Sequence, residues 1–314
     1  MTYAVIVLRQ LIMMMIYAVV GIISVKIGVM NEERLQPLAG LVTKLILPIT
    51  LFTNMLDNVS RRDLLTGLPM LALAIVQYIA VILLSLLLSR IFRLQGDRAR
   101  IYRATATFGN AGYLGIPLLI ALFPAAGMLY VSLYTLIDQT LMWSYGITLL
   151  TPEDRLGGTT LASRLRKLIN PCIVSILLAF VCILLGIRLP ELIDVPFGNI
   201  SATLTPIALI YLGGTLCYVD IKDCVRHGEF YGVILGKMLV LPVLLFVLFG
   251  LFPGIEPDQR FAITVFCGLP TFAACPMVAA SIGGDSKYAA KVVLMTTVAA
   301  LITLPLVCLI VGVL

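Results

Sequence analysis

Charged residues and histidine are both scarce in this sequence, and each shortage argues against a class of protein. Lys, Arg, Asp and Glu make up 12% of the 314 residues, whereas soluble domains carry roughly 25%. The single histidine, His227, and seven cysteines without a CxxC pair give little support to a metal site or a Ser-His-Asp hydrolase. Nucleotide-binding, zinc-protease and serine-hydrolase motifs are also missing, so we expect no enzyme and no cofactor.

Apolar residues are abundant in their place. Hydrophobic residues make up 61% of the chain, and its mean hydropathy is +1.08. Apolar runs fill the sequence from end to end, which indicates an integral membrane protein surrounded by lipid. The net charge of +6 predicts no nucleic-acid partner, because the basic residues lie in short loops, where they orient membrane segments.

Ten segments approach the roughly 20 apolar residues that a membrane span needs. The sequence therefore predicts an all-α polytopic protein with ten transmembrane helices. The N-terminal stretch 1–15 has neither a basic n-region nor a small-residue cleavage site, so we expect a retained first helix. The ten segments are 5–28, 36–56, 65–89, 101–122, 127–150, 169–188, 197–219, 230–252, 260–282 and 288–313.

The loop charges predict an orientation. Fifteen basic residues fall on one side: Lys26, Arg34, Arg90, Arg93, Arg98, Arg100, Arg103, Arg155, Arg164, Arg166, Lys167, Lys222, Arg226, Lys287 and Lys291. Five fall on the other: Arg9, Arg61, Arg62, Arg188 and Arg260. The excess of positive charge on the cytoplasmic side places both termini outside the cytoplasm.

The longest loop divides the chain into a first five-helix repeat, 1–150, a cytoplasmic linker, 151–168, and a second repeat, 169–314. Within the linker, Leu161, Leu165 and Leu168 share one helical face. This pattern favours a short interfacial helix over a helix that binds a partner.

The two halves have related patterns of proline and glycine. Pro117 and Pro276 are 159 residues apart, as are Gly109 and Gly268, while residues 48 and 206 are prolines at a separation of 158. A duplicated unit of five spans must enter the membrane in the opposite sense, because five is odd. The spacing therefore predicts two inverted repeats.

Two apolar stretches, 108–117 and 267–276, are interrupted by glycine and proline. Gly109, Gly112 and Gly115 alone would indicate a seam of close helix packing, Pro117 a kink, and Asn110 a hydrogen bond between helices. Lipid does not tolerate unpaired backbone groups, however, so paired breaks at matching places indicate broken helices that line a site.

Broken helices offer a binding site for an anion. Each break frees N–H groups at a half-helix start, which carries partial positive charge. Asn110 can bridge a substrate and freed backbone, since its amide both donates and accepts. In the second half we expect Gly268, Pro270, Thr271 and Pro276 to contribute from the opposite side. Leu269 replaces the asparagine there, which predicts an asymmetric site.

Three ionisable residues lie within predicted spans, where charges are costly and often functional. Lys44 is close enough to a span end to reach the membrane surface. Asp138 lies in mid-span and Lys237 lies within the eighth span, and they could form a buried ion pair. Alternatively, Asp138 takes up H⁺ or Na⁺ and Lys237 neutralises an anionic substrate. Gln77 is a further polar candidate in the third span.

The stretch FGNAGYLGIP at 108–117 resembles the fourth-span crossover of the auxin efflux carrier family. Softer matches are Leu47-Pro48 with Asn54, Asn170-Pro171, residues 205–209 and 213–216, Leu269-Pro270, Thr296-Thr297 and Leu304-Pro305. The resemblance implies ten spans in inverted repeats with both termini outside. It also implies a scaffold of spans 1, 2, 6 and 7 that forms a homodimer, and an elevator-like transport domain of the other spans.

The same resemblance implies organic anion substrates, such as auxin in plants and malate or malonate in bacterial relatives. The long cytoplasmic loop of many plant members is missing here, so the compact chain resembles a bacterial member. We therefore expect a secondary transporter of small organic anions in a bacterial plasma membrane.

Three alternatives remain open at this stage. A carrier related to the bile-acid/sodium symporters would require Na⁺ for uptake. A membrane-embedded lipid-phosphate enzyme would need clustered acids with His or Arg, which the single histidine argues against. A channel or a sensor would not show saturable, alternating-access kinetics.

Overall fold

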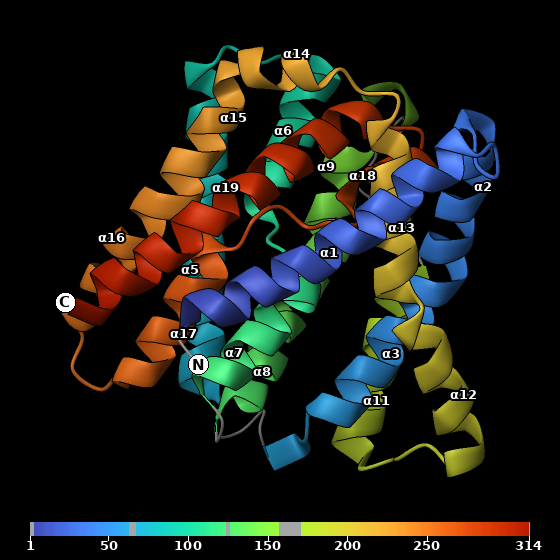
Figure 1. The fold of residues 1–314 in the computed structure, drawn as a ribbon. Coiled ribbons are helices and arrows are strands. Elements are labelled where there is room, and N and C mark those ends of the chain that lie inside the picture. Colours follow the sequence, from blue (N-terminus) through green and yellow to red (C-terminus); the bar gives the residue numbers. More distant parts are fainter. Residues whose placement is uncertain (1–2, 63–66, 124–125, 157–170, 314) are drawn as a thin grey trace.

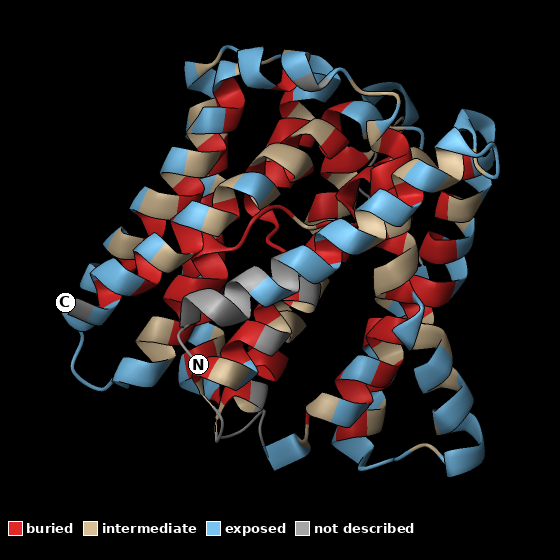
Figure 2. Ribbon diagram, viewed as in Figure 1, coloured by how far each residue is buried: buried red, intermediate tan, exposed pale blue. Residues whose placement is uncertain are grey.

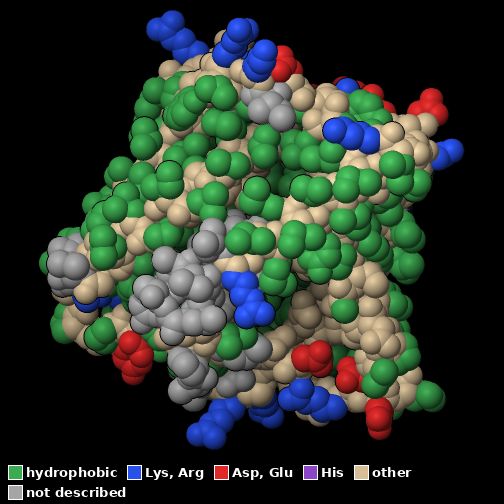
Figure 3. All heavy atoms as spheres, viewed as in Figure 1, with side chains coloured by type: hydrophobic (Ala, Val, Ile, Leu, Met, Phe, Trp, Pro, Cys, Tyr) green, Lys and Arg blue, Asp and Glu red, His purple; other side chains and the backbone are tan. Residues whose placement is uncertain are grey.

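The computed structural model of the chain describes residues 3–62, 67–123, 126–156 and 171–313, and this part is helical without any β-strand. On the face shown in Figure 3, hydrophobic side chains cover the middle of the molecule, and most charged side chains gather toward its two ends. Many large apolar residues are exposed. An apolar belt between charged ends is the surface of a polytopic membrane protein.

The first half contains eight α-helices among the described residues. They are α1 (Tyr3–Lys26), α2 (Glu32–Leu41), α3 (Leu47–Asn58), α5 (Leu68–Ile91), α6 (Gly96–Thr107), α7 (Ile116–Leu122), α8 (Gly127–Leu141) and α9 (Ile147–Leu150). π-Helical turns η1 (Val42–Ile46), η2 (Ala111–Gly115) and η3 (Met142–Gly146) join some of them, and the 3₁₀ turn η4 (Glu153–Leu156) follows α9.

The second half contains α11 (Pro171–Leu185), α12 (Glu191–Ala202), α13 (Leu204–Leu216), α14 (Ile221–Arg226), α15 (Gly228–Gly232), α16 (Leu241–Gly250), α17 (Pro257–Gly268), α18 (Cys275–Ser281) and α19 (Ser286–Val313). The π-helical η5 (Val233–Val240) joins α15 to α16. The interfacial helix that the sequence predicts at 161–168 lies outside the described residues.

Within the described ranges, five helical stretches are long and apolar enough to cross a membrane by themselves. They are Glu32–Asn58, Leu68–Ile91, Glu191–Leu216, Gly228–Gly250 and Ser286–Gly312. Two shorter apolar helices cover Ile12–Lys26 and Pro171–Leu185. An all-helical membrane protein is thus confirmed, while the count of ten spans and the inverted repeat stay predictions.

Proline explains where the π-helical turns occur. Three of the four π segments are followed by a helix with proline in its first turn, namely Pro48, Pro117 and Pro242. Proline has no backbone N–H and cannot continue the regular hydrogen-bond ladder, so a wider turn absorbs the mismatch.

The helices pack into two groups (Figure 1). The scaffold group comprises residues 3–58 and 171–216, in which α1 packs on α13, and α11 and α12 pack on α3. Gly21 and Gly213 permit the close approach of α1 and α13, because a Cβ atom at either position would overlap backbone of the other helix. The crossing group comprises residues 68–156 and 221–313, which contain α5–α9 and α14–α19.

Both broken helices belong to the crossing group. α6 ends at Thr107 before η2 begins at Ala111, and α17 ends at Gly268 before α18 begins at Cys275. The non-helical segment 269–274 passes through the centre of the molecule in Figure 1, and Figure 2 shows it almost entirely buried. The glycine- and proline-rich stretches of the sequence therefore interrupt helices in the core.

Candidate functional site

The two broken helices cross each other at their breaks. The Asn110 N–H donates to the Pro270 carbonyl at 2.8 Å, and the Phe272 N–H donates to the Phe108 carbonyl at 3.1 Å. These bonds form one isolated antiparallel β-bridge. Backbone groups that each break releases thus pair with the other break, which avoids the penalty of leaving them unsatisfied in an apolar core.

Side chains satisfy further freed groups. The Thr271 hydroxyl donates to the Thr105 carbonyl at 2.9 Å, and the Thr271 N–H donates to Thr296 Oγ1 at 3.2 Å. The Lys237 ammonium donates to the Leu269 carbonyl at the end of α17. Both breaks are therefore held by specific contacts in the folded protein.

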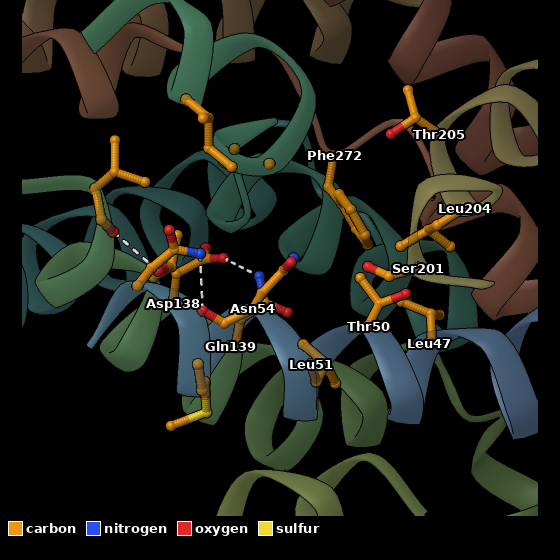
Figure 4. A pocket seen from close by; sticks show the side chains of 17 residues that line it. Leu47, Thr50, Leu51, Asn54, Asp138, Gln139, Ser201, Leu204, Thr205 and Phe272 are labelled. Carbon is orange, nitrogen blue, oxygen red and sulfur yellow. Dashed lines mark hydrogen bonds between the residues drawn. The ribbon is translucent and has the colours of Figure 1, made fainter. Parts of the chain in front are cut away.

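A cavity of about 280 Å³ lies beside the crossing, between the scaffold and crossing groups (Figure 4). Its polar lining residues are Thr50, Asn54, Asn58, Thr135, Asp138, Gln139, Ser201 and Thr205. In Figure 4, Asp138, Gln139 and Asn54 gather at one end, with the Phe272 ring between them and Ser201. Of the described residues that line it, none is Lys, Arg or His.

A hydrogen-bond network fixes the carboxylate of Asp138, which is 3% exposed. Tyr78 OH donates to Asp138 Oδ1, and Gln139 Nε2 donates to Asp138 Oδ2 at 2.6 Å. Tyr134 OH in turn donates to Tyr78 OH at 3.1 Å, and Trp143 Nε1 donates to Gln139 Oε1 at 3.0 Å. The network presents the carboxylate to the cavity in one orientation.

The sequence left open whether Asp138 and Lys237 pair with each other. No ion pair joins them in the described structure: Asp138 is bound by Tyr78 and Gln139, and Lys237 by a backbone carbonyl. Gln77 Nε2 donates to a tyrosine hydroxyl of the Asp138 network at 3.2 Å. Lys44 is exposed, but it lies near the middle of the continuous helical stretch Glu32–Asn58 and not close to one of its ends.

Three of the residues predicted to form the site line the cavity: Gly109, Gly112 and Asp138. Leu47, Asn54 and Thr205, which the sequence analysis named only as family matches, line it too. Asn110 does not, although it is fully buried at the crossing. Its Nδ2 lies 3.8 Å from the sulfur of Met14 on α1, and its Oδ1 has no hydrogen-bond partner among the described residues. An unpaired buried amide oxygen costs about 1–3 kcal/mol.

The remaining predicted residues lie near the crossing but not on the cavity wall. Gly115 packs tightly, since a Cβ there would lie 3.0 Å from Leu269 Cδ1. Pro270 and Thr271 belong to the second break, Gly268 and Pro276 flank it, and the side chain of Pro117 lies outside the described residues.

Sequence reasoning did not assign α3 to the site, although Leu47 and Asn54 were among the family matches. Thr50, Asn54 and Asn58 recur at intervals of four, so they share one helical face and line the cavity together. A polar stripe along an otherwise apolar helix was the available signal. Thr135 and Gln139 form the same pattern on α8, next to Asp138.

Over the described residues, no group of three or more His, Cys, Asp and Glu side chains could hold a metal ion. The cavity can instead bind a small polar molecule, since it combines hydroxyl, amide and carboxyl groups with apolar walls.

Comparison with known proteins agrees with a transport role. The family described as membrane transport protein matches residues 6–160 and 159–308. An uncharacterised transporter of Methanocaldococcus jannaschii is 23% identical over 303 residues, which cover 93% of this chain and 94% of that protein. The chain therefore belongs to the membrane transport protein family, that of the auxin efflux carriers, and it is a transporter rather than an enzyme.

Proposed function

We propose that this protein is a secondary transporter of small organic anions, with carboxylates as the substrate class. The observation that carries the proposal is the position of the cavity, which lies between the two helix groups and touches the crossing. Its volume of about 280 Å³ is near the lower end of the range for ligand pockets, about 300–1,000 Å³. A small metabolite therefore fits better than a lipid.

Neutral donors and helix ends would recognise the anion. The continuous η2–α7 helix begins at Ala111, directly beside the cavity-lining Gly109 and Gly112. Its N-terminus carries partial positive charge, as the start of a broken helix does in other transporters. Hydroxyl and amide groups on the cavity wall, such as those of Ser201 and Asn54, supply further donors.

Asp138 links the substrate to a coupling ion in this proposal. A carboxylate substrate beside an ionised Asp138 would be repelled, since two like charges at close range disfavour each other. Uptake of H⁺ by Asp138 together with the substrate removes this repulsion. Binding of Na⁺ at Asp138 is the corresponding step in the alternative, a carrier like the bile-acid/sodium symporters.

The hydrogen bonds within the crossing group support an elevator-like movement. The hydrogen bonds of Asp138, Lys237 and Thr271 all stay within the crossing group, which favours motion as one unit. An ion pair between Lys287 and Glu32, 2.7 Å long, joins the groups at the surface. Such exposed pairs contribute about 0–1 kcal/mol, so this contact presents little barrier.

In this proposal the protein has the membrane arrangement that the sequence predicts. Ten spans in two inverted repeats, with both termini outside the cytoplasm, agree with the loop charges and with the opposed breaks. The scaffold group would form a homodimer in a bacterial plasma membrane. The two groups of packed helices correspond to the scaffold and transport domains that the family resemblance implies.

Thermal unfolding of the purified protein with a panel of mono- and dicarboxylates tests the proposal. A bound carboxylate should raise the melting temperature of the wild type and of Asn199→Leu, a control at an exposed position of α12. Asn54→Leu should lose this shift. The panel is measured at two pH values, with and without Na⁺, to identify the coupling ion. If no carboxylate shifts the wild type, or if N54L shifts equally, the proposed site is wrong.

A further inference from the structure

Lys237 is a buried cation that makes no direct contact with a carboxylate among the described residues, although Asp138 attracts it from a longer distance. Its side chain is 2% exposed, and none of the ion pairs between described residues includes it. The effective penalty for burying an ammonium is several kcal/mol, which a single neutral hydrogen bond does not offset. Asp138 does not touch the ammonium, so groups that contact it at the crossing must supply further compensation.

Two half-helix C-termini supply that compensation. The ammonium donates to the Leu269 carbonyl, and Leu269 is the C-cap of α17. The ammonium also lies at the end of α6, since a Cβ atom on Gly109 would be 3.5 Å from Lys237 Nζ. Each helix C-terminus carries roughly −0.5 charge, so two of them together carry about −1. One ammonium neutralises this pair.

Converging helix C-termini with exposed carbonyls are also the environment in which transporters coordinate Na⁺. We propose that the Lys237 ammonium is a built-in cation, which occupies the position where the ends of α6 and α17 would otherwise bind a small monovalent cation. The crossing of the wild-type protein therefore holds no Na⁺. This inference concerns the folded protein, and it holds whether or not the neighbouring cavity carries a carboxylate.

The residues around the ammonium fit this role. Gly109 leaves room for it, since a side chain there would meet both Lys237 Nζ and, at 3.3 Å, Leu269 Cβ. The lysine reaches the crossing from η5, whose π-helical geometry sets Lys237 apart from the regular ladder of the flanking helices. Removing the ammonium should leave the two negative helix ends facing each other across a space that Na⁺ can enter.

Melting temperatures in NaCl and in choline chloride at matched ionic strength test the proposal. Lys237→Ala should melt several degrees below the wild type in choline chloride and regain part of this loss in NaCl. Wild type and Lys44→Ala, a control at an exposed lysine, should lack this gain. Lys237→Met fills the space without a charge, so it should melt low in both salts.

Two outcomes overturn the proposal. The first is that NaCl raises the melting temperature of K237A no more than that of the wild type. A K237A protein that folds in neither salt would count against the proposal in the same way. The second is a K237M protein as stable as Lys237→Arg, which would show that charge at the crossing is dispensable. This second comparison does not depend on obtaining K237A.

Discussion

Alanine substitution at Gly112 and at Gly115 makes the same chemical change at two positions three residues apart, and we expect opposite effects. A Cβ at Gly115 would lie 3.0 Å from Leu269 Cδ1 and 3.3 Å from Phe266 Cε1. A Cβ at Gly112 would meet no atom within 4 Å, because it would point into open space at the cavity wall.

The neighbours of Gly115 cannot yield easily. Leu269 is 0% and Phe266 1% exposed, and Phe266 stacks on Tyr134 with ring centroids 3.8 Å apart. Overpacking of this kind costs about 1–3 kcal/mol. The gain in helix propensity from Gly to Ala is at most about 1 kcal/mol. Gly115→Ala should therefore lower the free energy of unfolding by about 1–2 kcal/mol. Gly112→Ala should keep any gain in helix propensity, because its Cβ meets no neighbour.

Thermal unfolding in detergent measures this difference. A change of 1 kcal/mol moves the melting temperature by about 2–4 °C in chains of 150–250 residues, and somewhat less in this longer one. G115A should melt a few degrees below the wild type, and G112A at or above it. The methyl group of G112A should also weaken the shift caused by a bound carboxylate. A G112A protein that melts as low as G115A would refute the reasoning.

Three further predictions concern contacts away from these glycines. Tyr78→Phe removes a hydrogen bond to the Asp138 carboxylate, so it should lower the stability by about 1.5–3 kcal/mol in thermal melts; an unchanged melting temperature would contradict this. Gly213→Ala places a Cβ against the backbone of α1, which should destabilise the scaffold by about 3 kcal/mol and reduce the yield of folded protein on size-exclusion chromatography. A normal yield would contradict the α1–α13 packing. Lys291 holds the pKa of the Asp223 carboxyl below its ordinary value of 3.8 through a 2.6 Å hydrogen bond. The lowered pKa contributes stability that is fully present above 3.8 and is lost as the pH falls through the lowered value. The melting temperature of Lys291→Met should therefore depend less on pH than that of the wild type as the pH falls below about 4, and parallel curves would show that the pair has no effect.

The broken helices could be predicted because glycine and proline act locally. Gly109 and Pro270 each lie in a cluster of glycine and proline, and a cluster disfavours a continuous helix more than the single prolines that α2, α12 and α19 contain.

The cavity could not be predicted in this way. The polar stripe that begins at Thr50 shows that one face of α3 is special, but not which helix faces it. The contact between Lys237 and Leu269 joins residues that are 32 positions apart, and it depends on how two interrupted helices meet. Asn110 shows the same limit. Its local pattern predicted that it lies at the crossing, but it did not predict to which side its amide points.

Proton-driven uptake into proteoliposomes tests the central claim most directly. The substrate is the carboxylate that gives the largest thermal shift. The wild-type protein should accumulate it when a proton gradient is imposed, and Asp138→Asn should bind it without responding to the gradient. If D138N accumulates the carboxylate as the wild type does, or if the wild type transports no carboxylate, the proposed cavity does not carry the substrate in the way described here.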